Sequence, residues 1–510
     1  MLSSVHDTIK EYQNFIEYIH KVGPLQLYSK WWLDLYESAP QHVIVETALT
    51  IFIIWLLFIR TTIDPKKEAD TKLSSKEMDW LIQTWSPTSL VPKLSNSQMS
   101  NLNQMVTITS VDGNYVKIKE NSNNTKLLNL STMDFLGMSR LLELKNASID
   151  ALNKYGCGAC GPRGFYGTID KHLDFETEIA RFMGTPEAIS YSDGASTVAS
   201  TIPAFAKKGD LLIVDDAASE PIRTGAILSR ARVEYFPHNN MKALREILSS
   251  IAKDDKKYKR DATQQRRFII AEGLSRNIGD ICNLPELVEL KNEFCYRLIL
   301  DESLSFGTVG KTGKGLTEYY NIDISEIEII TIAMDTALAS IGGACVGSRE
   351  VVDHQRLMGA GYCFSAAAPP FLSAAAIASL SELENNTKRV EKLQELSEYF
   401  HKSIKKLDKY IIPTSSKNSP VIHLIKSSEK DKEYDWNEQD KYVKELEIEM
   451  KKSGYLVIAT RYDDNDIIFY EKNGITSIKP SLRINLHSDL TTKDIDKTIT
   501  ALKAACKSVA

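Results

Sequence analysis

From about residue 186 to residue 347, short β-branched and aliphatic runs alternate with amphipathic stretches of helical length, and this alternation constrains the fold most. Strand, helix and strand in repeated succession are typical of a mostly parallel sheet that helices cover on both faces. We therefore predict an α/β fold built on roughly seven strands, with helices over 171–183 and 285–295 among the connections. The predicted strands are 188–192, 211–214, 232–236, 267–271, 297–300, 327–333 and 344–347.

The segments outside this sheet suggest further domains. Asp112-Gly113 is a hairpin signal within the segment 61–130. After Pro369-Pro370 a helix-like stretch covers 371–408, and short strands near the C-terminus indicate a second, smaller α/β domain. Those strands are 420–424, 455–459 and 482–486. The predicted divisions are 1–62 as an aromatic segment with an apolar helix, 63–145 as a linker and small-domain segment, 146–375 as the large domain, and 376–510 as a long helix with the C-terminal domain.

Val43 to Ile59 is the strongest apolar run of the chain. A bilayer span needs about 17–25 predominantly apolar residues, so the run is at the short end of that range and a buried core helix is the alternative. Trp55 and aromatic residues upstream resemble interfacial anchors, and we predict one transmembrane helix over about 43–59. Basic residues are concentrated after the run, which predicts that the C-terminal part faces the cytosol. Whether 11–36 lies on the membrane surface or packs as an ordinary helix stays open.

Composition excludes several classes of protein. Lys+Arg 62 against Asp+Glu 67 gives a net charge of −5, which gives no reason to expect nucleic-acid binding. A hydrophobic content of 43% with 25% charged residues is ordinary for a globular chain. The cysteines are odd in number and scattered, which favours reduced thiols over a disulfide framework. Cys157 and Cys160 have the spacing of a redox or zinc pair, yet the sequence has no second pair, and we predict no metal site.

Acidic residues follow several of the predicted strands, and the carboxyl ends of parallel strands are where ligands bind. They are Asp215, Asp216, Glu272, Asp301 and Glu302. Each acid alone is more often a helix cap or a solvated loop residue. Asp301 differs because it closes an apolar run and precedes a glycine-rich turn to Gly315. Its carboxylate could hold a cationic ring nitrogen.

Four segments together are far more specific than any one of them. They are GPRGFYGT at 161–168 followed by His172 and Glu176, DESLSFGTVGKTGKG at 301–315, ALASIGGACVGS at 337–348, and DHQRLMGAGYCFSAAAPP at 353–370. Over about 40–505 the chain resembles the α-oxoamine synthases, pyridoxal-phosphate enzymes that join an amino acid to an acyl-CoA. Within that family it is most similar to the first long-chain-base subunits of eukaryotic serine palmitoyltransferases.

The resemblance implies fold type I, an obligate dimer and an active site at the subunit interface. It also implies condensation of L-serine with palmitoyl-CoA to 3-ketosphinganine, with loss of carbon dioxide and CoA, as the first step of sphingolipid synthesis. It matches Asp301 to the aspartate that pairs with the pyridinium nitrogen and His172 to a histidine stacked on the ring. Two further histidines of the family fall at Leu304 and Ser219. The alternative role for Asp301 and His172 is packing or hydrogen bonding.

Thr336 occupies the position that the resemblance assigns to the lysine carrying the cofactor, six residues before Gly342-Gly343. No lysine occurs from Glu326 to Ser348, and a hydroxyl cannot form a Schiff base. A hydroxyl that the family uses on the cofactor phosphate is replaced by Ala333. We therefore expect no catalytic residue on this chain, and we expect pyridoxal 5'-phosphate on the lysine of a partner subunit.

The expected role is that of a required but chemically silent subunit, in a heterodimer with a lysine-bearing homologue. The residues expected to reach the partner's site are Cys160, Arg163, Tyr166 and Ser365, with ordinary interface contacts as their alternative. Glycines around the first three allow close approach of another chain. Of an Arg-x-Arg pair that the family uses on the substrate carboxylate, only Arg483 remains, with Ser481 at the other position.

Two other functions stay open: a membrane scaffold or regulatory protein without a role in catalysis, and an independent enzyme that uses a displaced lysine, Lys311 or Lys314. The resemblance also implies a single-pass location in the endoplasmic reticulum membrane. It further implies a small activating subunit and an Orm-type regulator as partners.

Overall fold

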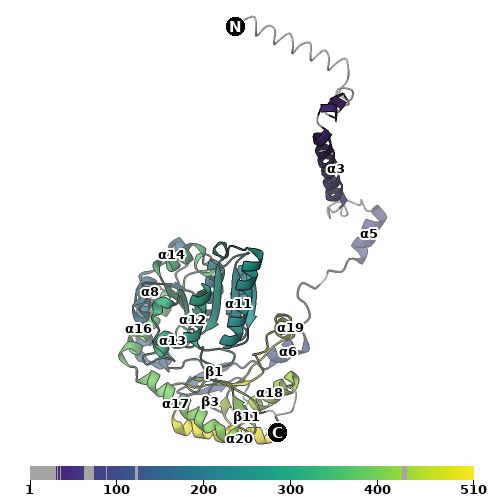
Figure 1. Ribbon diagram of the computed structural model, residues 1–510. Coiled ribbons are helices and arrows are strands. Elements are labelled where there is room, and N and C mark those ends of the chain that lie inside the picture. The colour runs from purple at the N-terminus through teal and green to yellow at the C-terminus, as the bar shows by residue number, and fades with distance from the viewer. Residues whose placement is uncertain are drawn as a thin grey trace. The chain divides into compact units, whose positions relative to one another are not determined.

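The computed structural model describes residues 30–31, 33–34, 36–38, 40–62, 74–87, 89–120, 125–427 and 434–509. The chain divides into two compact units, Met1–Lys93 and Leu94–Ala510 (Figure 1). The question of 11–36 falls mostly outside the described residues, as do residues 63–73 of the predicted segment 63–145. The finer domain boundaries expected from the sequence remain predictions.

In the first unit, a helix covers the predicted apolar run: α3 (Pro40–Thr62). Large apolar side chains of α3, among them Ile51, Ile54 and Trp55, are exposed. No helix in the described part of the chain is long and apolar enough to cross a membrane, so the predicted transmembrane helix is not confirmed. Another helix of this unit, α5 (Ser75–Thr84), follows Ser74, whose side chain and backbone both bond to Glu77.

The second unit contains the predicted seven-stranded sheet, with strand order β4-β10-β9-β8-β7-β5-β6. The strands are β4 (Glu187–Tyr191), β5 (Leu211–Asp215), β6 (Arg232–Phe236), β7 (Arg267–Glu272), β8 (Arg297–Asp301), β9 (Ile329–Ala333) and β10 (Gly343–Gly347). Neighbouring strands from β6 to β9 run parallel, which confirms a mostly parallel sheet. β10 is antiparallel to both β4 and β9.

Helices cover both faces of this sheet, which explains the almost continuous apolar runs of its strands. Along β5, Leu211 and Ile213 belong to one buried cluster, and Leu212 and Val214 belong to the other. α8 (Asp170–Met183), α11 (Met241–Tyr258) and α12 (Leu284–Phe294) pack on the first face. α9 (Gly194–Phe205), α10 (Glu220–Ser229) and α14 (Arg349–Met358) pack on the second. Two short helices, α13 (Leu316–Tyr320) and α15 (Ala360–Cys363), lie in the connections.

The predicted long helix over 371–408 is wrong in one respect, because it is two helices. α16 (Pro370–Asn385) ends at Asn386, whose φ of −138° and ψ of 73° are not helical, and α17 (Lys388–Ile404) follows. Asn and Thr are poor helix formers in a helix interior, which favours the break at Asn386-Thr387.

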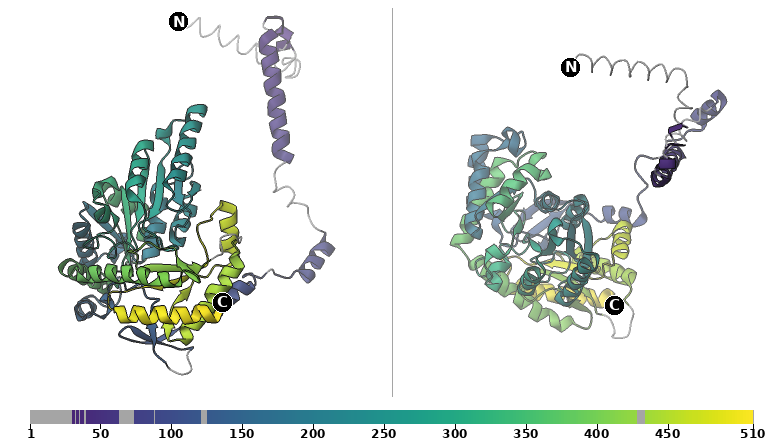
Figure 2. Two further views of the ribbon diagram at one scale, coloured as in Figure 1. Left: turned by 60° about the horizontal axis from the view of Figure 1, so that its bottom comes forward. Right: turned by 45° about the horizontal axis from the view of Figure 1, so that its top comes forward.

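The C-terminal strands form a sheet of order β11-β12-β15-β14. They are β11 (Ile411–Pro413), β12 (Val421–Lys426), β14 (Ile458–Ala459) and β15 (Leu482–Asn485). The accompanying helices are α18 (Trp436–Lys452), α19 (Asp464–Asn473) and α20 (Thr492–Val509). The helix α20, yellow in Figure 2, packs beside α17 and α18. The predicted strands 420–424 and 482–486 are therefore confirmed, whereas the predicted strand 455–459 is divided into β14 and a second short strand that belongs to another sheet.

A third sheet joins the beginning of this unit to its end. The predicted hairpin is confirmed as β1 (Ile108–Asp112) and β2 (Tyr115–Ile118), with Gly113 at a φ of 56° in the turn. β3 (Leu127–Asn129) pairs with β2 on one side and, in parallel, with β13 (Tyr455–Leu456) on the other. The helices α6 (Asn96–Asn103) and α7 (Leu142–Tyr155) flank this sheet in the sequence.

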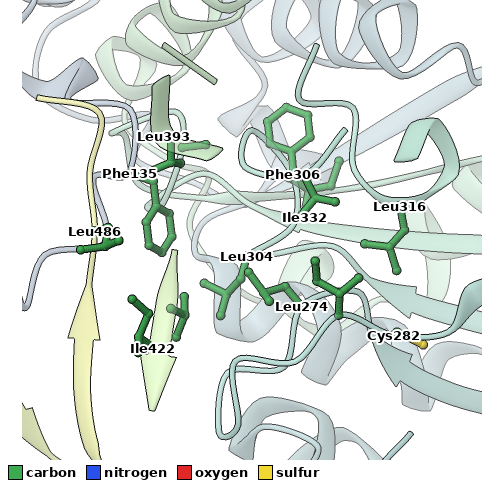
Figure 3. Close-up of a cluster of buried hydrophobic side chains, with 14 of the residues drawn as sticks. Phe135, Leu274, Cys282, Leu304, Phe306, Leu316, Ile332, Leu393, Ile422 and Leu486 are labelled. Atoms are coloured by element: carbon green, nitrogen blue, oxygen red, sulfur yellow. The ribbon is translucent and has the colours of Figure 1, made fainter. Parts of the chain in front are cut away.

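One apolar core runs through the large and C-terminal parts of the second unit. Figure 3 shows Phe135, Ile422 and Leu486 beside Leu304 and Leu274. All five are buried and belong to one cluster. The large sheet and the C-terminal sheet are therefore held together by burial of apolar surface, the main favourable contribution to folding.

Candidate functional site

A cavity of ≈ 480 Å³ opens at the carboxyl ends of the parallel strands. The ends of β8 and β9, the first turns of α9 and α10, the loop after β7, and α19 with its preceding loop form its walls. The lining residues include Ser219, Arg223, Arg276, Asn277, Asp301, Ser303, Ala333, Asp335, Arg461, Tyr462 and Tyr470. The sequence predicts that ligands bind at these strand ends, and the cavity lies there.

Asp301 lies buried in this cavity, as the sequence predicts. Its Oδ1 accepts hydrogen bonds from the Ser303 hydroxyl at 2.6 Å and the Thr331 hydroxyl at 2.8 Å. Burial raises the pKa of the Asp301 carboxyl, against those two hydrogen bonds. Its neighbour in the sheet register is Glu272, whose pKa is raised to about 7, first by burial and second by the charge of Asp301.

Thr336 is fully buried just beyond the end of β9. Its hydroxyl donates to the backbone oxygen of Ser303 at 2.9 Å and lies 3.3 Å from that of Ala333. Ala333 and Asp335 line the cavity, whereas Thr336 does not. The position expected for a cofactor-binding amine therefore holds a hydroxyl that is already bonded to the backbone.

Neither displaced-lysine candidate lines this cavity. The Lys314 ammonium lies over the Phe182 ring, 5.4 Å from its centroid, and Lys311 is exposed. In the described part of the chain, the residues that line the cavity include no lysine. The alternative of a displaced catalytic lysine has no geometric support.

The two positions that the resemblance matches to further histidines hold Leu304 and Ser219. Leu304 is buried in the apolar core beside Ile422 (Figure 3). Ser219 lines the cavity as the residue before α10, and its hydroxyl lowers the pKa of Glu272. Neither side chain reproduces the charge or the ring of a histidine.

His172 does not line the cavity above Asp301. Its Nδ1 accepts from the backbone N–H of Ile169 at 3.1 Å, and its Nε2 lies 2.7 Å from the backbone oxygen of Ala368. Burial lowers the pKa of His172, which favours the neutral ring with the proton on Nε2. Both ring nitrogens of His172 are thus used in hydrogen bonds to the backbone.

The four residues expected to reach a partner's site divide into two inward and two outward side chains. Arg163 is buried, and its Nη1 donates to Glu176 at 2.8 Å and to the Ser190 hydroxyl at 2.6 Å. The Ser365 hydroxyl lies 3.3 Å from that of Ser192. Cys160 and Tyr166 are exposed, with φ values of 56° and 66°.

Two aromatic residues that the sequence reasoning missed accompany Tyr166 on the surface. Phe165 and Phe364 are 66% and 84% exposed. Phe364 follows α15, and the backbone N–H of Ala367 donates to the oxygen of Gly161 at 2.9 Å, which links that segment to the glycine-rich run. Large exposed apolar side chains of this kind are typical of protein–protein contacts.

The arginines that line the cavity were also missed. Arg276 follows the end of β7 by four residues, and its backbone N–H donates to Glu272 at 3.2 Å. Arg223 and Arg461 come from α10 and from the loop before α19. A basic residue just after a strand end was the available signal for Arg276, but Arg461 is brought in by a distant part of the chain.

The cavity fits a pyridine ring only in part. Asp301 is placed to accept from a ring nitrogen, since its Oδ2 makes no hydrogen bond among the described residues. Thr336 supplies no amine and Ala333 supplies no hydroxyl for a phosphate. Covalent attachment of pyridoxal phosphate to this chain therefore does not fit the residues present.

Comparisons with known proteins agree with this fold. A model of the family described as aminotransferase class I and II matches residues 125–502. Serine palmitoyltransferase 1 of Dictyostelium discoideum is 37% identical over 469 residues, which cover 91% of this chain and 94% of that protein. Long chain base biosynthesis protein 1 of Arabidopsis thaliana is 39% identical over 383 residues, 75% of this chain and 76% of the relative.

Solved structures share the architecture. Serine palmitoyltransferase from S. paucimobilis superposes with a TM-score of 0.69 at 21% identity, covering 79% of this chain and 93% of that one. 8-Amino-7-oxononanoate synthase from Francisella tularensis gives a TM-score of 0.59 at 23% identity, over 75% and 98% of the two chains. At these identities the likeness shows the fold.

Proposed function

Because this chain belongs to the class I and II aminotransferase family, as a homologue of serine palmitoyltransferase 1, we propose that it is a required, non-catalytic subunit of a membrane-bound serine C-palmitoyltransferase. The complex would condense L-serine with palmitoyl-CoA to 3-ketosphinganine, the first step in the synthesis of sphingolipid bases. Catalysis would depend on a homologous partner that carries the missing lysine.

One observation carries this proposal: the hydroxyl of Thr336 bonds to the backbone oxygen of Ser303 where a lysine amine is needed. Pyridoxal phosphate, bound to the partner, supplies the electron sink for carbon–carbon bond chemistry at the amino acid. This chain contributes surface, shape and hydrogen bonds. Its own cavity keeps Asp301 but lacks the groups for covalent binding.

We propose that the glycine-rich run and the segment after α15 form the face toward the partner. Cys160, Phe165, Tyr166 and Phe364 present exposed side chains there. The buried ion pair between Arg163 and Glu176 anchors the run from beneath, since an arginine held by a carboxylate and a hydroxyl is fixed in position. Arg163 and Ser365 would thus act through the shape of this face.

We also propose that the complex resides in the endoplasmic reticulum membrane, with the second unit facing the cytosol. The exposed apolar side chains of α3 support membrane association, and the basic residues after the run support the orientation. Four Asn-x-Ser/Thr sequons follow α3, at Asn123, Asn129, Asn146 and Asn385. A glycosidase-sensitive mass shift on any of them would show that the orientation is wrong.

The test is to express the full chain alone, the lysine-bearing homologue alone, and the two together, and to measure 3-ketosphinganine from serine and palmitoyl-CoA. We expect activity with both chains and none with this chain alone. Activity of this chain by itself would refute the proposal. Full activity of the homologue alone would favour a scaffold role instead. Co-purification with small activating subunits and an Orm-type regulator would identify the further partners that we propose.

A further inference from the structure

One buried carboxylate lies beneath both segments of the proposed partner face, the glycine-rich run at 161–168 and the segment after α15. It belongs to Glu176 on α8. Burying a carboxylate is costly unless its charge is neutralised and its oxygens accept hydrogen bonds. The groups that surround Glu176 therefore show what this side chain holds in place.

The Oε1 atom of Glu176 connects the glycine-rich run to the large sheet. It accepts from Nη1 of Arg163 at 2.8 Å, and it accepts from the backbone N–H and the hydroxyl of Ser190 at 2.8 and 2.9 Å. Ser190 lies on β4. The Nε of Arg163 donates to the Thr168 hydroxyl at 3.1 Å, so the same guanidinium group also bonds to the end of the run.

The Oε2 atom of Glu176 faces the other segment. It lies 3.9 Å from Nη2 of Arg356 on α14, and Nη1 of Arg356 donates to the Tyr362 hydroxyl on α15 at 3.4 Å. The Arg163 guanidinium lies over the Tyr362 ring, 5.3 Å from its centroid, an arrangement in which the cation and the ring attract each other. Glu176 therefore lies between two arginines that contact the same tyrosine.

The same face of α8 holds the segment after α15 through a second side chain. His172 precedes Glu176 by four residues, and side chains at this spacing lie on one face of a helix. The Nε2 of His172 lies 2.7 Å from the backbone oxygen of Ala368. Because the N–H of Ala367 also donates to the oxygen of Gly161, the two segments are bonded to each other and to α8.

The glycine-rich run depends on such support because part of its backbone is strained. Cys160 and Tyr166 have φ values of 56° and 66°, and non-glycine residues keep this conformation only where the surrounding structure holds them. Arg163 lies between these two residues in the sequence. Among the described residues, Glu176 is the only carboxylate that forms an ion pair with Arg163, so the loss of its charge would release the run.

We propose that Glu176 is a positioning residue for the reaction of the two-chain complex, because it fixes both segments of the partner face through Arg163 and Arg356. Glu176 itself touches neither substrate nor cofactor. This inference rests on the proposed function. It adds that the two segments are held by one carboxylate and respond together when that carboxylate is lost.

Hydrogen exchange of the full chain, purified without a partner, tests this coupling. Glu176→Gln keeps the shape of the side chain and can still accept from Ser190, but it removes the charge that the two arginines share. The probes are the N–H groups of Phe165, Gly167 and Ala367, all of which are hydrogen-bonded. We expect exchange to become faster by about tenfold or more in both segments, since an unpaired buried charge favours local opening. Wild-type exchange in either segment would overturn the proposal.

Asp255→Asn is the matched control for a general loss of stability. Asp255 also forms a buried ion pair, with Nη1 of Arg267 at 2.7 Å, and it lies on α11. Like Glu176→Gln, this variant should lower the midpoint of thermal unfolding. It should leave exchange of the two segments as in the wild type, and equal acceleration in both variants would contradict a specific role of Glu176.

The activity of the two-chain complex tests the positioning role. We expect Glu176→Gln to co-purify with the lysine-bearing homologue and to lower kcat by about tenfold or more, because small displacements of groups at a reacting centre have large effects on rate. Asp255→Asn should keep the wild-type kcat. Unchanged kcat for Glu176→Gln in an otherwise active complex would overturn this inference alone. An inactive wild-type complex would refute the proposed function and the positioning role with it.

If Glu176→Gln does not fold, Arg356→Met decides. Arg356 is partly exposed, so its loss is less disruptive, and it removes only the connection to Tyr362. We expect faster exchange at Ala367 and a lower kcat. Wild-type values of both would show that Glu176 does not position this segment.

Discussion

The hydroxyl of Thr336 donates to the backbone oxygen of Ser303 across 2.9 Å, and this bond joins the end of β9 to the loop that leaves Asp301. The end of β9 and the loop after β8, which would lie on either side of a bound cofactor, are thus held together. The bond replaces a reactive amine by a structural contact. It gives a physical reason to expect that a single substitution will not produce an active site on this chain.

We expect Thr336→Lys to leave the isolated chain unable to form 3-ketosphinganine. The residues of a catalytic unit act together, and Leu304 and Ala333 still lack the contacts to the cofactor. Weak covalent binding of pyridoxal phosphate is expected, since Asp301 remains in place. Borohydride reduction followed by peptide mapping would detect it at residue 336. A pyridoxyl group on any lysine of the wild-type chain would show that the silent-subunit proposal is wrong.

We expect Cys160→Trp to abolish or alter the activity of the two-chain complex while this chain is still expressed. Cys160 is exposed on the proposed partner face, and an indole there would overpack a close contact, at a cost of about 1–3 kcal/mol. Cys295 is a matched control, because it is also exposed and also has a positive φ, 57° against 56°. Cys295→Trp should keep wild-type turnover. Equal turnover of both variants would remove the glycine-rich run from the interface.

We expect the free energy of unfolding to fall at alkaline pH as His238 loses its proton. Its Nδ1 lies 2.8 Å from Asp215 and its Nε2 lies 3.6 Å from Asp280. Although burial alone would lower it, the pKa of His238 is raised to about 10 by these carboxylates, above its ordinary value of 6.5. The stabilisation is therefore complete below pH 6.5 and is lost as the pH rises through about 10.

Urea unfolding at several pH values measures this effect. His238→Gln should lower the free energy of unfolding by about 3–5 kcal/mol at pH 6, since it removes the positive charge beside the buried Asp215 carboxylate. The difference from the wild type should shrink toward pH 10. His354→Gln is the comparison, because His354 bonds to the backbone oxygen of Ala204 rather than to a carboxylate. A pH-independent difference for His238→Gln would contradict the assignment.

Glu272→Gln should stabilise the chain at alkaline pH. The pKa of Glu272 is raised from 4.5 to about 7, chiefly by burial, so its ionisation opposes folding as the pH rises from 4.5 through 7. Gln keeps the shape and removes the charge. We expect a gain of about 1–3 kcal/mol at pH 8 and almost none at pH 4.5. Thermal unfolding at both pH values tests this, and a gain that is equal at both would refute it.

The sequence predicts the large sheet well because both of its faces are buried, so that runs such as Leu211 to Val214 contain only apolar residues. Burial of both faces also removes any sequence signal for the direction in which a strand runs. The segment from Ala344 to Val346 is as apolar as the neighbouring strands, and nothing in it indicates that β10 is antiparallel. The hydrogen bonds of the two His172 ring nitrogens, to the backbone of Ile169 and of Ala368, likewise follow from the tertiary structure and not from a local pattern.

The candidate site, too, could be predicted from the sequence only in part. Asp301 could be placed from its position at a strand end, because the sheet topology brings it there. The hydrogen bond between His423 and the backbone oxygen of Arg276 depends on how the C-terminal sheet packs against the large one, and no local pattern carries that information. Leu304 could be read as a lost histidine, but only the packing beside Ile422 shows that it became part of the core.

The parallel pairing of β3 with β13 has a consequence for biosynthesis. β3 leaves the ribosome early, whereas β13 is translated after the whole large sheet, so the sheet that contains both cannot be completed until synthesis is nearly finished. The large sheet consists of elements that are closer in sequence and can form first. During this interval the edge of β3 has no β13 to pair with, and a nascent chain held near other copies is exposed to mispairing there. Pairing with β13 therefore protects the edge of β3 in the newly made chain.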